Sequence, residues 1–139
     1  ITTLIDDLKM GEGSRTSGHR LAKRIADIPG EKAVFCTSDI ISFGIIDATR
    51  QLGLIPGADF ALVSYDDYDG DGLTPFGEPL LSSINARRGT CAKIAIKLLL
   101  DRIDNPSDEE IIIKKIPTHL VVRSSSGRAT ATTTSEAIS

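Results

Sequence analysis

Two short polar groups follow apolar stretches of the sequence, and their side chains could bind a small polar ligand. Thr37-Ser38-Asp39 follows the apolar residues 33–36, and Tyr65-Asp66-Asp67 follows the apolar residues 60–63. A carboxylate accepts hydrogen bonds from adjacent hydroxyl groups or from an amine, and a serine hydroxyl both donates and accepts. In an open α/β sheet the ligand crevice normally lies beyond the carboxyl ends of the strands. We therefore expect a binding site, if the two stretches are neighbouring strands, where these groups meet.

The acidic stretch after the second group also matches a calcium-binding loop. The pattern D-x-D-x-D-G-x5-E is met by Asp67, Asp69, Asp71, Gly72 and Glu78. A loop of this kind joins two helices. Here an apolar strand enters the loop, and Pro75 and Pro79 precede another strand candidate. We therefore predict that the loop is not a metal site.

Catalysis would require a nucleophile and a base in a suitable arrangement. The two histidines, His19 and His119, lie in stretches typical of protein surface. Asp66 and Asp67 could imitate a hydrolase pair, but adjacent residues at a strand end point in different directions. The sequence contains no GxSxG, GxGxxG or phosphate-binding loop. We predict a protein that is not an enzyme and needs no cofactor.

Charge and composition argue against direct contact with DNA or a membrane. The 139 residues carry a formal net charge of -3, whereas nucleic-acid-binding domains usually have a basic excess. The basic residues 14–28 could form a recognition helix, but Pro29-Gly30 and an apolar strand follow with no second helix nearby. No stretch approaches the roughly 18 apolar residues of a membrane helix, and the start lacks the layout of a secretion signal. Cys36 and Cys91 show no metal-binding spacing, which favours reduced thiols and a cytoplasmic location.

The hydrophobic pattern alternates between strands and helices. Helical periodicity covers residues 14–28, 40–52 and 88–104, and apolar runs predict strands at 33–36, 60–63, 80–84, 111–113 and 118–123. The order of strand, helix and strand with short loops implies right-handed crossovers and a parallel sheet whose first strand is buried on both faces. We expect an α/β domain over residues 1–126 and a polar, disordered tail over residues 127–139.

Four motifs in this order resemble a known family. GSRTSGHRLA, AVFCTSDIISFGIIDATRQLGLIPGADFALVSYDD, PLLSSI and IPTHLVVRSSS are similar to the distal part of lactose-repressor/galactose-repressor (LacI/GalR) regulators, from about Gly11 to Ser126. The resemblance implies an incomplete lobe of a three-layer, parallel-sheet fold of the type I periplasmic binding protein class. The DNA-binding head would lie outside this chain, so operator DNA would be contacted only through that head.

The resemblance also assigns roles to individual residues. Ser38, Asp39 and Asp66 match the positions that line the effector cleft, and a sugar or a nucleoside-like molecule would be the effector. Asp39 has an alternative role as the cap of a helix that starts at Ile40, and Asp67 as the cap of a turn. Arg15 stands near the start of the 14–28 helix, where it could bind a phosphate or carboxylate or remain a solvated surface residue.

Members of the family dimerise through the helix after the Ser-Asp pair and through the loop after Tyr-Asp-Asp. Phe43 and Ile46 fall outside the apolar stripe of the 40–52 helix, which indicates an exposed surface for a second copy in a two-fold homodimer. The alternative is that they pack under a neighbouring loop. In the family the 88–104 helix belongs to a second lobe, so we expect it to pack against another chain here.

One rival interpretation shares the same fold. A periplasmic sugar receptor of a transport system would bind a similar ligand without regulating transcription. The sequence upstream of Ile1 discriminates between the two, because a regulator would carry a helix-turn-helix head and a receptor a signal peptide. The two free thiols and the LVVRSS ending favour the regulator.

Overall fold

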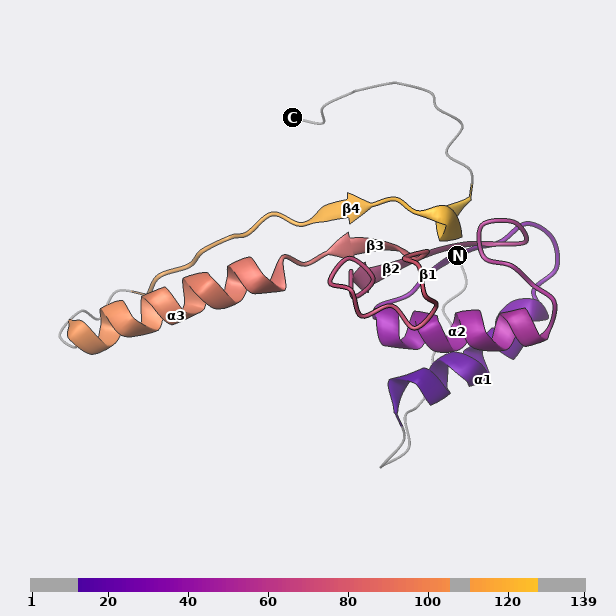
Figure 1. The fold of residues 1–139 in the computed structure, drawn as a ribbon, viewed down its shortest axis with the longest axis horizontal. Helices are drawn as coiled ribbons and strands as arrows, with labels where there is room; N and C mark the ends of the chain where they lie inside the picture. Colours follow the sequence, from indigo (N-terminus) through magenta and orange to yellow (C-terminus); the bar gives the residue numbers. More distant parts are fainter. Residues whose placement is uncertain (1–12, 106–110, 128–139) are drawn as a thin grey trace, which may run out of the picture.

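A single four-stranded sheet carries the elements that position the candidate site (Figure 1). The computed structural model describes residues 13–105 and 111–127. The strands lie in the order of the sequence: β1 (Ala33–Phe35), β2 (Ala61–Asp66), β3 (Ser82–Asn85) and β4 (His119–Val121).

The first three strands run parallel, as the alternation of strands and helices predicts. Val34 pairs with Leu62, and Val63 pairs with Ser82, so the carboxyl ends of β1, β2 and β3 meet at one edge of the sheet. β4 runs antiparallel to β3, with Ser83 opposite Val121. The α/β class with a mostly parallel sheet is therefore confirmed.

In the described part of the chain, three α-helices and one 3-10 helix accompany the sheet: α1 (Ser14–Ala26), α2 (Asp39–Gln51), α3 (Arg88–Asp104) and η1 (Ser124–Ser126). Figure 1 shows α1 and α2 on the same side of the sheet, whereas α3 extends away from it. α2 ends where Gly53 adopts a φ of 77°, as expected of a glycine that stops a helix. No helix among the described residues has the length and apolar character needed to cross a membrane.

Two glycines allow α1 and α2 to touch backbone to backbone. A Cβ atom on Gly18 would lie 2.0 Å from the carbonyl oxygen of Ile41, and one on Gly44 would lie 2.0 Å from the carbonyl oxygen of Arg15. Either atom would overlap with backbone that cannot move aside cheaply. The contact therefore requires glycine at both positions, and it fixes α1 against the helix that begins at the candidate site.

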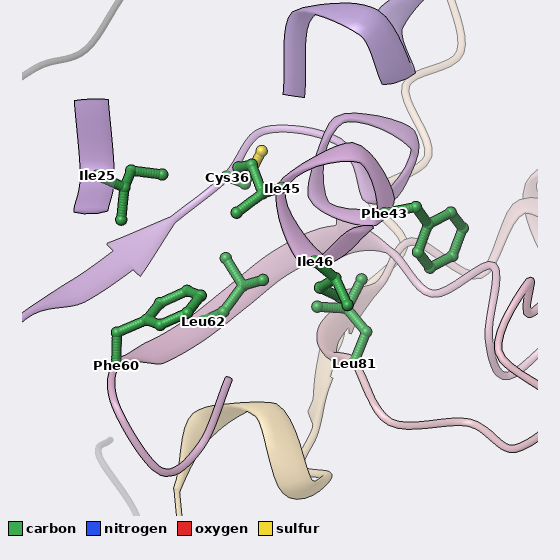
Figure 2. Close-up of a cluster of buried hydrophobic side chains, with 8 residues drawn as sticks. All are labelled: Ile25, Cys36, Phe43, Ile45, Ile46, Phe60, Leu62 and Leu81. Carbon is green, nitrogen blue, oxygen red and sulfur yellow. The ribbon is translucent and has the colours of Figure 1, made fainter. Parts of the chain in front are cut away.

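The hydrophobic core lies between the sheet and these two helices (Figure 2). Its fully or nearly fully buried members are Ile25, Cys36, Phe43, Ile45, Ile46, Phe60, Leu62 and Leu81. Aliphatic side chains predominate, in line with a sequence that has four Phe and no Trp. Burial of each large side chain contributes about 1.5–3 kcal/mol, so this cluster holds α2 and β2 in place.

The expectation that the first strand is buried on both faces is wrong. β1 pairs only with β2 in the described part of the chain, and side chains alternate between the two faces of a strand. Val34 packs against the core, whereas Phe35 points to the opposite face and is 61% exposed. An apolar run of this length does not reveal whether a second layer covers its outer face.

The expected strand at 111–113 does not form. These residues belong to no strand and are exposed, with Ile111 at 85%, and they lie in the segment that leads from α3 to β4 (Figure 1). They have no partner strand there. The predicted tail lies outside the described residues except for Gly127.

The apolar side of α3 is also uncovered. The sequence predicts an apolar stripe on this helix, yet none of its residues is buried, and Leu99 is 60% exposed. The stripe therefore finds no partner among the described residues.

Candidate functional site

The parallel strands bring the three predicted cleft residues to one edge of the sheet. Ser38 and Asp39 follow β1, and Asp66 is the last residue of the neighbouring β2. Asp39 and Asp66 are close enough for the charge of Asp66 to raise the pKa of Asp39. The expected geometry, two acidic strand ends at one rim, is present.

Asp39 has an internal role in this structure. Its side chain is fully buried, and its Oδ1 accepts a hydrogen bond from the Ser83 hydroxyl at 2.7 Å. Its Oδ2 accepts one from the backbone N–H of Tyr68, also at 2.7 Å. Asp39 is the first residue of α2 and Ser38 precedes it, with no side-chain cap. Asp39 therefore does not cap α2, and in this structure it connects β3 and the acidic loop (residues 67–78) to the helix. Its expected contact with a ligand stays a prediction.

Burial governs the ionisation of Asp39. Removal from water raises its pKa above the ordinary 3.8, and the negative charge of Asp66 raises it further. Hydrogen bonds from Ser83, Ser64 and the Tyr68 backbone act in the opposite direction but do not cancel the effect of burial. Ionisation of Asp39 is thus opposed by the fold around it.

Ser38 and Asp66 are only partly buried, so they remain within reach of a ligand. The side chain of Asp66 is 23% exposed, and its Oδ1 lies 3.6 Å from Nη1 of Arg88. The backbone carbonyl of Asp66 accepts a hydrogen bond of 2.6 Å from the same nitrogen. Ser38 is half-buried beside Cys36, whose thiol is 3.5 Å from the Ser38 carbonyl oxygen.

Asp67 is the centre of a buried polar network that sequence reasoning missed. Its Oδ1 pairs with Arg123 at 2.7 Å and accepts the Gly70 N–H at 3.2 Å, while its Oδ2 accepts the Asn85 amide at 2.6 Å. The bond to Gly70 is the turn cap considered as the alternative role. The signal for the other contacts was weak, because Asn85, at the end of β3, and Arg123, after β4, lie far along the chain from Asp67.

The calcium-loop residues do not converge. Asp67 is occupied by Arg123, Asp71 is paired with Arg88, and Oδ2 of Asp69 accepts the backbone N–H groups of Leu80 and Leu81. Across residues 13–105 and 111–127, no three His, Cys, Asp or Glu side chains form a group that could hold a metal ion. The acidic side chains here hold the loop in shape.

Arg15 of α1 forms an ion pair with Asp47 of α2. Its Nε donates to Oδ2 of Asp47 at 2.8 Å, and His19 lies 3.6 Å from the same oxygen. Asp47 is in the second half of α2, away from the residue that begins the helix at the strand edge. The guanidinium of Arg15 thus already has a carboxylate partner, and its binding of an anionic ligand stays a prediction.

Phe43 and Ile46 are buried, at 3% and 0% exposed, so the prediction of an exposed partner surface is wrong. The ring of Phe43 packs edge-on against Phe76, with centroids 5.6 Å apart at 80°. Phe76 belongs to the loop between β2 and β3, so the alternative, packing under a neighbouring loop, is the correct one. Periodicity failed here because the helix is covered on two sides, by the sheet and by that loop.

Helices and a mostly parallel sheet with hydroxyl and carboxylate groups at one edge define this chain as an α/β domain. The chain belongs to the periplasmic binding protein-like domain family, which it matches over residues 4–126. It is 38% identical to the ribose operon repressor of Haemophilus influenzae over 76 residues, 55% of this chain and 22% of that protein. It is 31% identical to the HTH-type transcriptional repressor PurR of Escherichia coli over 108 residues, 77% of this chain and 31% of that protein.

The fold is also that of solved regulators. A LacI family transcriptional regulator from Enterococcus faecium with bound ribose superposes with a TM-score of 0.71 over 81% of this chain and 40% of that chain, at 24% identity. The family match and these relatives confirm the resemblance found in the sequence. Both of these relatives are repressors. The chain spans less than a third of either repressor.

Proposed function

We propose that this chain is the effector-binding and dimerisation segment of a LacI-type transcriptional regulator. A small polar ligand, a sugar or a nucleoside-like molecule, binds at the strand edge and controls operator binding through a head outside this chain. The observation that carries the proposal is the meeting of Ser38 and Asp66, both partly exposed, at the carboxyl edge of the parallel sheet. This is where α/β sheets of this kind bind ligands.

The residues at this edge have different proposed roles in ligand binding. The carboxylate of Asp66 accepts hydrogen bonds from two adjacent hydroxyls or from an amine of the ligand, and the Ser38 hydroxyl donates or accepts one more. Asp39 keeps the edge rigid through Ser83 and the Tyr68 backbone. A rigid support under a binding residue reduces the entropy lost on binding.

Calorimetry with the 139-residue chain tests this proposal. D-ribose, adenosine and guanosine are titrated into the wild type and into Asp66→Asn, which keeps the size of the side chain and removes its charge. A hydrogen bond to a charged group contributes about 1.5–3 kcal/mol, so the variant should bind at least about tenfold more weakly. Glu31→Gln, which removes an exposed carboxylate before β1, is the control and should bind as the wild type does.

Two outcomes contradict the proposal. One is the absence of binding by any sugar or nucleoside in a wider panel. The other is equal affinity in the wild type and in Asp66→Asn, which would place the ligand elsewhere.

The cytoplasm is the location that suits a regulator with free thiols at Cys36 and Cys91. A homodimer is the default assembly for such a regulator. Since Phe43 and Ile46 are buried, we propose that a second copy packs on the apolar side of α3, where Ile96, Leu99 and Ile103 are 59–63% exposed. Sedimentation should therefore show a dimer that Leu99→Glu weakens and Lys97→Glu, on an already polar position, does not.

A further inference from the structure

Backbone strain is concentrated where β2 and β3 end. Among the described residues, three that are not glycine have positive φ angles: Asp66 at 128°, Asp67 at 63° and Arg87 at 50°. Asp66 is paired with Asn85 across the two strands, so all three residues lie at the same edge of the sheet. Each such conformation is unfavourable and persists only where surrounding contacts enforce it. Surrounding contacts must therefore hold the end of β2 and the end of β3 in these conformations at the candidate site.

One side chain makes several of the contacts between these two segments. Arg88, the first residue of α3, donates from Nη1 to the backbone carbonyl of Asp66 at 2.6 Å, and its Nη2 is paired with Asp71. Its guanidinium also lies over the ring of Tyr68, 4.2 Å from the centroid. One arginine thereby connects the start of α3 to the end of β2 and to the acidic loop that follows it.

The same guanidinium also forms an ion pair with the side chain of Asp66, with Nη1 of Arg88 3.6 Å from Oδ1 of Asp66. This pair is open to water: the side chains of Arg88 and Asp66 are 34% and 23% exposed, and Asp71 is 53% exposed. The neighbouring pair between Arg123 and Asp67 is far more enclosed, at 15% and 3%. Partly exposed ion pairs are weak, so the contacts of Arg88 can exchange while those of Arg123 persist.

We propose that Arg88 is a latch on Asp66: it holds the acidic loop against α3, and a ligand that reaches the Asp66 carboxylate must displace it. The ligand-competition part rests on the proposed function of Asp66 as an effector contact. Binding of the ligand then releases the start of α3 from the loop, which links occupancy of the site to the position of that helix. Arg123 and Asp67 keep the rest of the loop in place during the exchange.

Hydrogen exchange of the 139-residue chain without ligand tests the latch directly. The amides of Asp71, Gly72 and Leu73 are bonded to carbonyl groups of the same loop, so their exchange reports loop opening. In Arg88→Ala they should exchange about tenfold faster than in the wild type, with the core strands unchanged. Arg88→Lys, which keeps the charge, should show a smaller rise. Lys93→Ala removes a charge from an exposed position of α3 and should match the wild type.

Titration with D-ribose tests the competition separately. If Arg88 competes with the ligand, Arg88→Ala should bind about fivefold more tightly than the wild type, which corresponds to roughly 1 kcal/mol. Unchanged loop exchange in Arg88→Ala, or weaker ribose binding by that variant, overturns the proposal. If ribose binds to neither protein, that result counts against ribose as the effector, and the exchange measurement alone decides whether the latch exists.

Discussion

Arg123, which follows β4, reaches Asp67, which follows β2, with Nη1 and Oδ1 2.7 Å apart in a nearly closed environment. Arg123 also donates to the carbonyl oxygen of Leu81 at 2.7 Å. The ion pair therefore joins the last strand of the chain to the loop of the candidate site. The segment after β4 also contacts the sheet directly, because the Ser125 hydroxyl donates to the carbonyl oxygen of Leu62 at 2.7 Å.

Replacement of Arg123 should destabilise the fold strongly. Arg123→Ala leaves the carboxylate of Asp67 buried without its cationic partner, and loss of one partner of a buried pair costs about 3–5 kcal/mol. Urea denaturation followed by circular dichroism measures the change in the free energy of unfolding. Lys114→Ala, on an exposed residue of the segment before β4, is the matched loss of a positive charge and should change stability by less than about 0.5 kcal/mol.

The close contact of α1 and α2 predicts a second large effect. Gly44→Ala places a methyl group 2.0 Å from the Arg15 carbonyl oxygen, so the helices must separate. Overpacking of this kind costs about 1–3 kcal/mol, measured as a fall in the free energy of unfolding. Gly89→Ala in α3, where nothing lies within 4 Å of the added atom, should be neutral or slightly stabilising. Equal effects at the two glycines would contradict the close approach.

Substitution of Phe43 distinguishes a role in the hydrophobic core from a role in a dimer interface. Because its ring is 3% exposed and packs against Phe76, Phe43→Ala should lower the free energy of unfolding by about 3–5 kcal/mol. The substitution should not weaken self-association under conditions where the variant stays folded. Sedimentation and denaturation of the same samples measure both quantities. A stable variant that dissociates would contradict the core role and support a role of Phe43 in the dimer interface.

Local patterns of the sequence were enough to predict most of the fold. Residues 40–52 and 88–104 were expected as helices, and α2 and α3 differ from those ranges by one residue at most. The parallel order followed from the alternation of strands and helices, since crossover connections place successive strands side by side. The prediction of a strand at 111–113 was wrong because three successive isoleucines favour an extended backbone but do not show whether a partner strand is present.

The site was predictable in position but not in detail. The strand ends that carry Ser38 and Asp66 could be found from apolar runs followed by polar residues. Whether Asp39 faces a ligand or the interior depends on Ser83 and Tyr68, which lie 44 and 29 positions away. Such contacts arise from the tertiary arrangement, and no periodicity in a short window contains them. The same limit hid Arg88 and Arg123 as partners of the acidic loop.

The ionisation of Asp39 predicts a specific dependence of stability on pH. Burial raises its pKa in the folded state above the ordinary 3.8, so between these two values the folded protein binds more protons than the unfolded chain. The stability that the protonated carboxyl contributes is present below the lower value and is lost as the pH rises through the raised one. In Asp39→Asn the neutral amide keeps the shape of the protonated acid, with its oxygen free to accept the Tyr68 N–H and its nitrogen able to donate to Ser83.

Urea denaturation of the wild type and Asp39→Asn from pH 4 to pH 7 measures this difference. The free energy of unfolding of the wild type relative to the variant should fall as the pH rises. The fall is at most about 1.4 kcal/mol for each pH unit between the pKa of Asp39 in the unfolded chain and its raised pKa in the folded state. Asp104→Asn, on an exposed residue at the end of α3, gives the background effect of a lost surface carboxylate. A relative stability that rises with pH would mean that the folded state favours the charged form of Asp39, through the hydrogen bonds of Ser83 and Tyr68 outweighing burial.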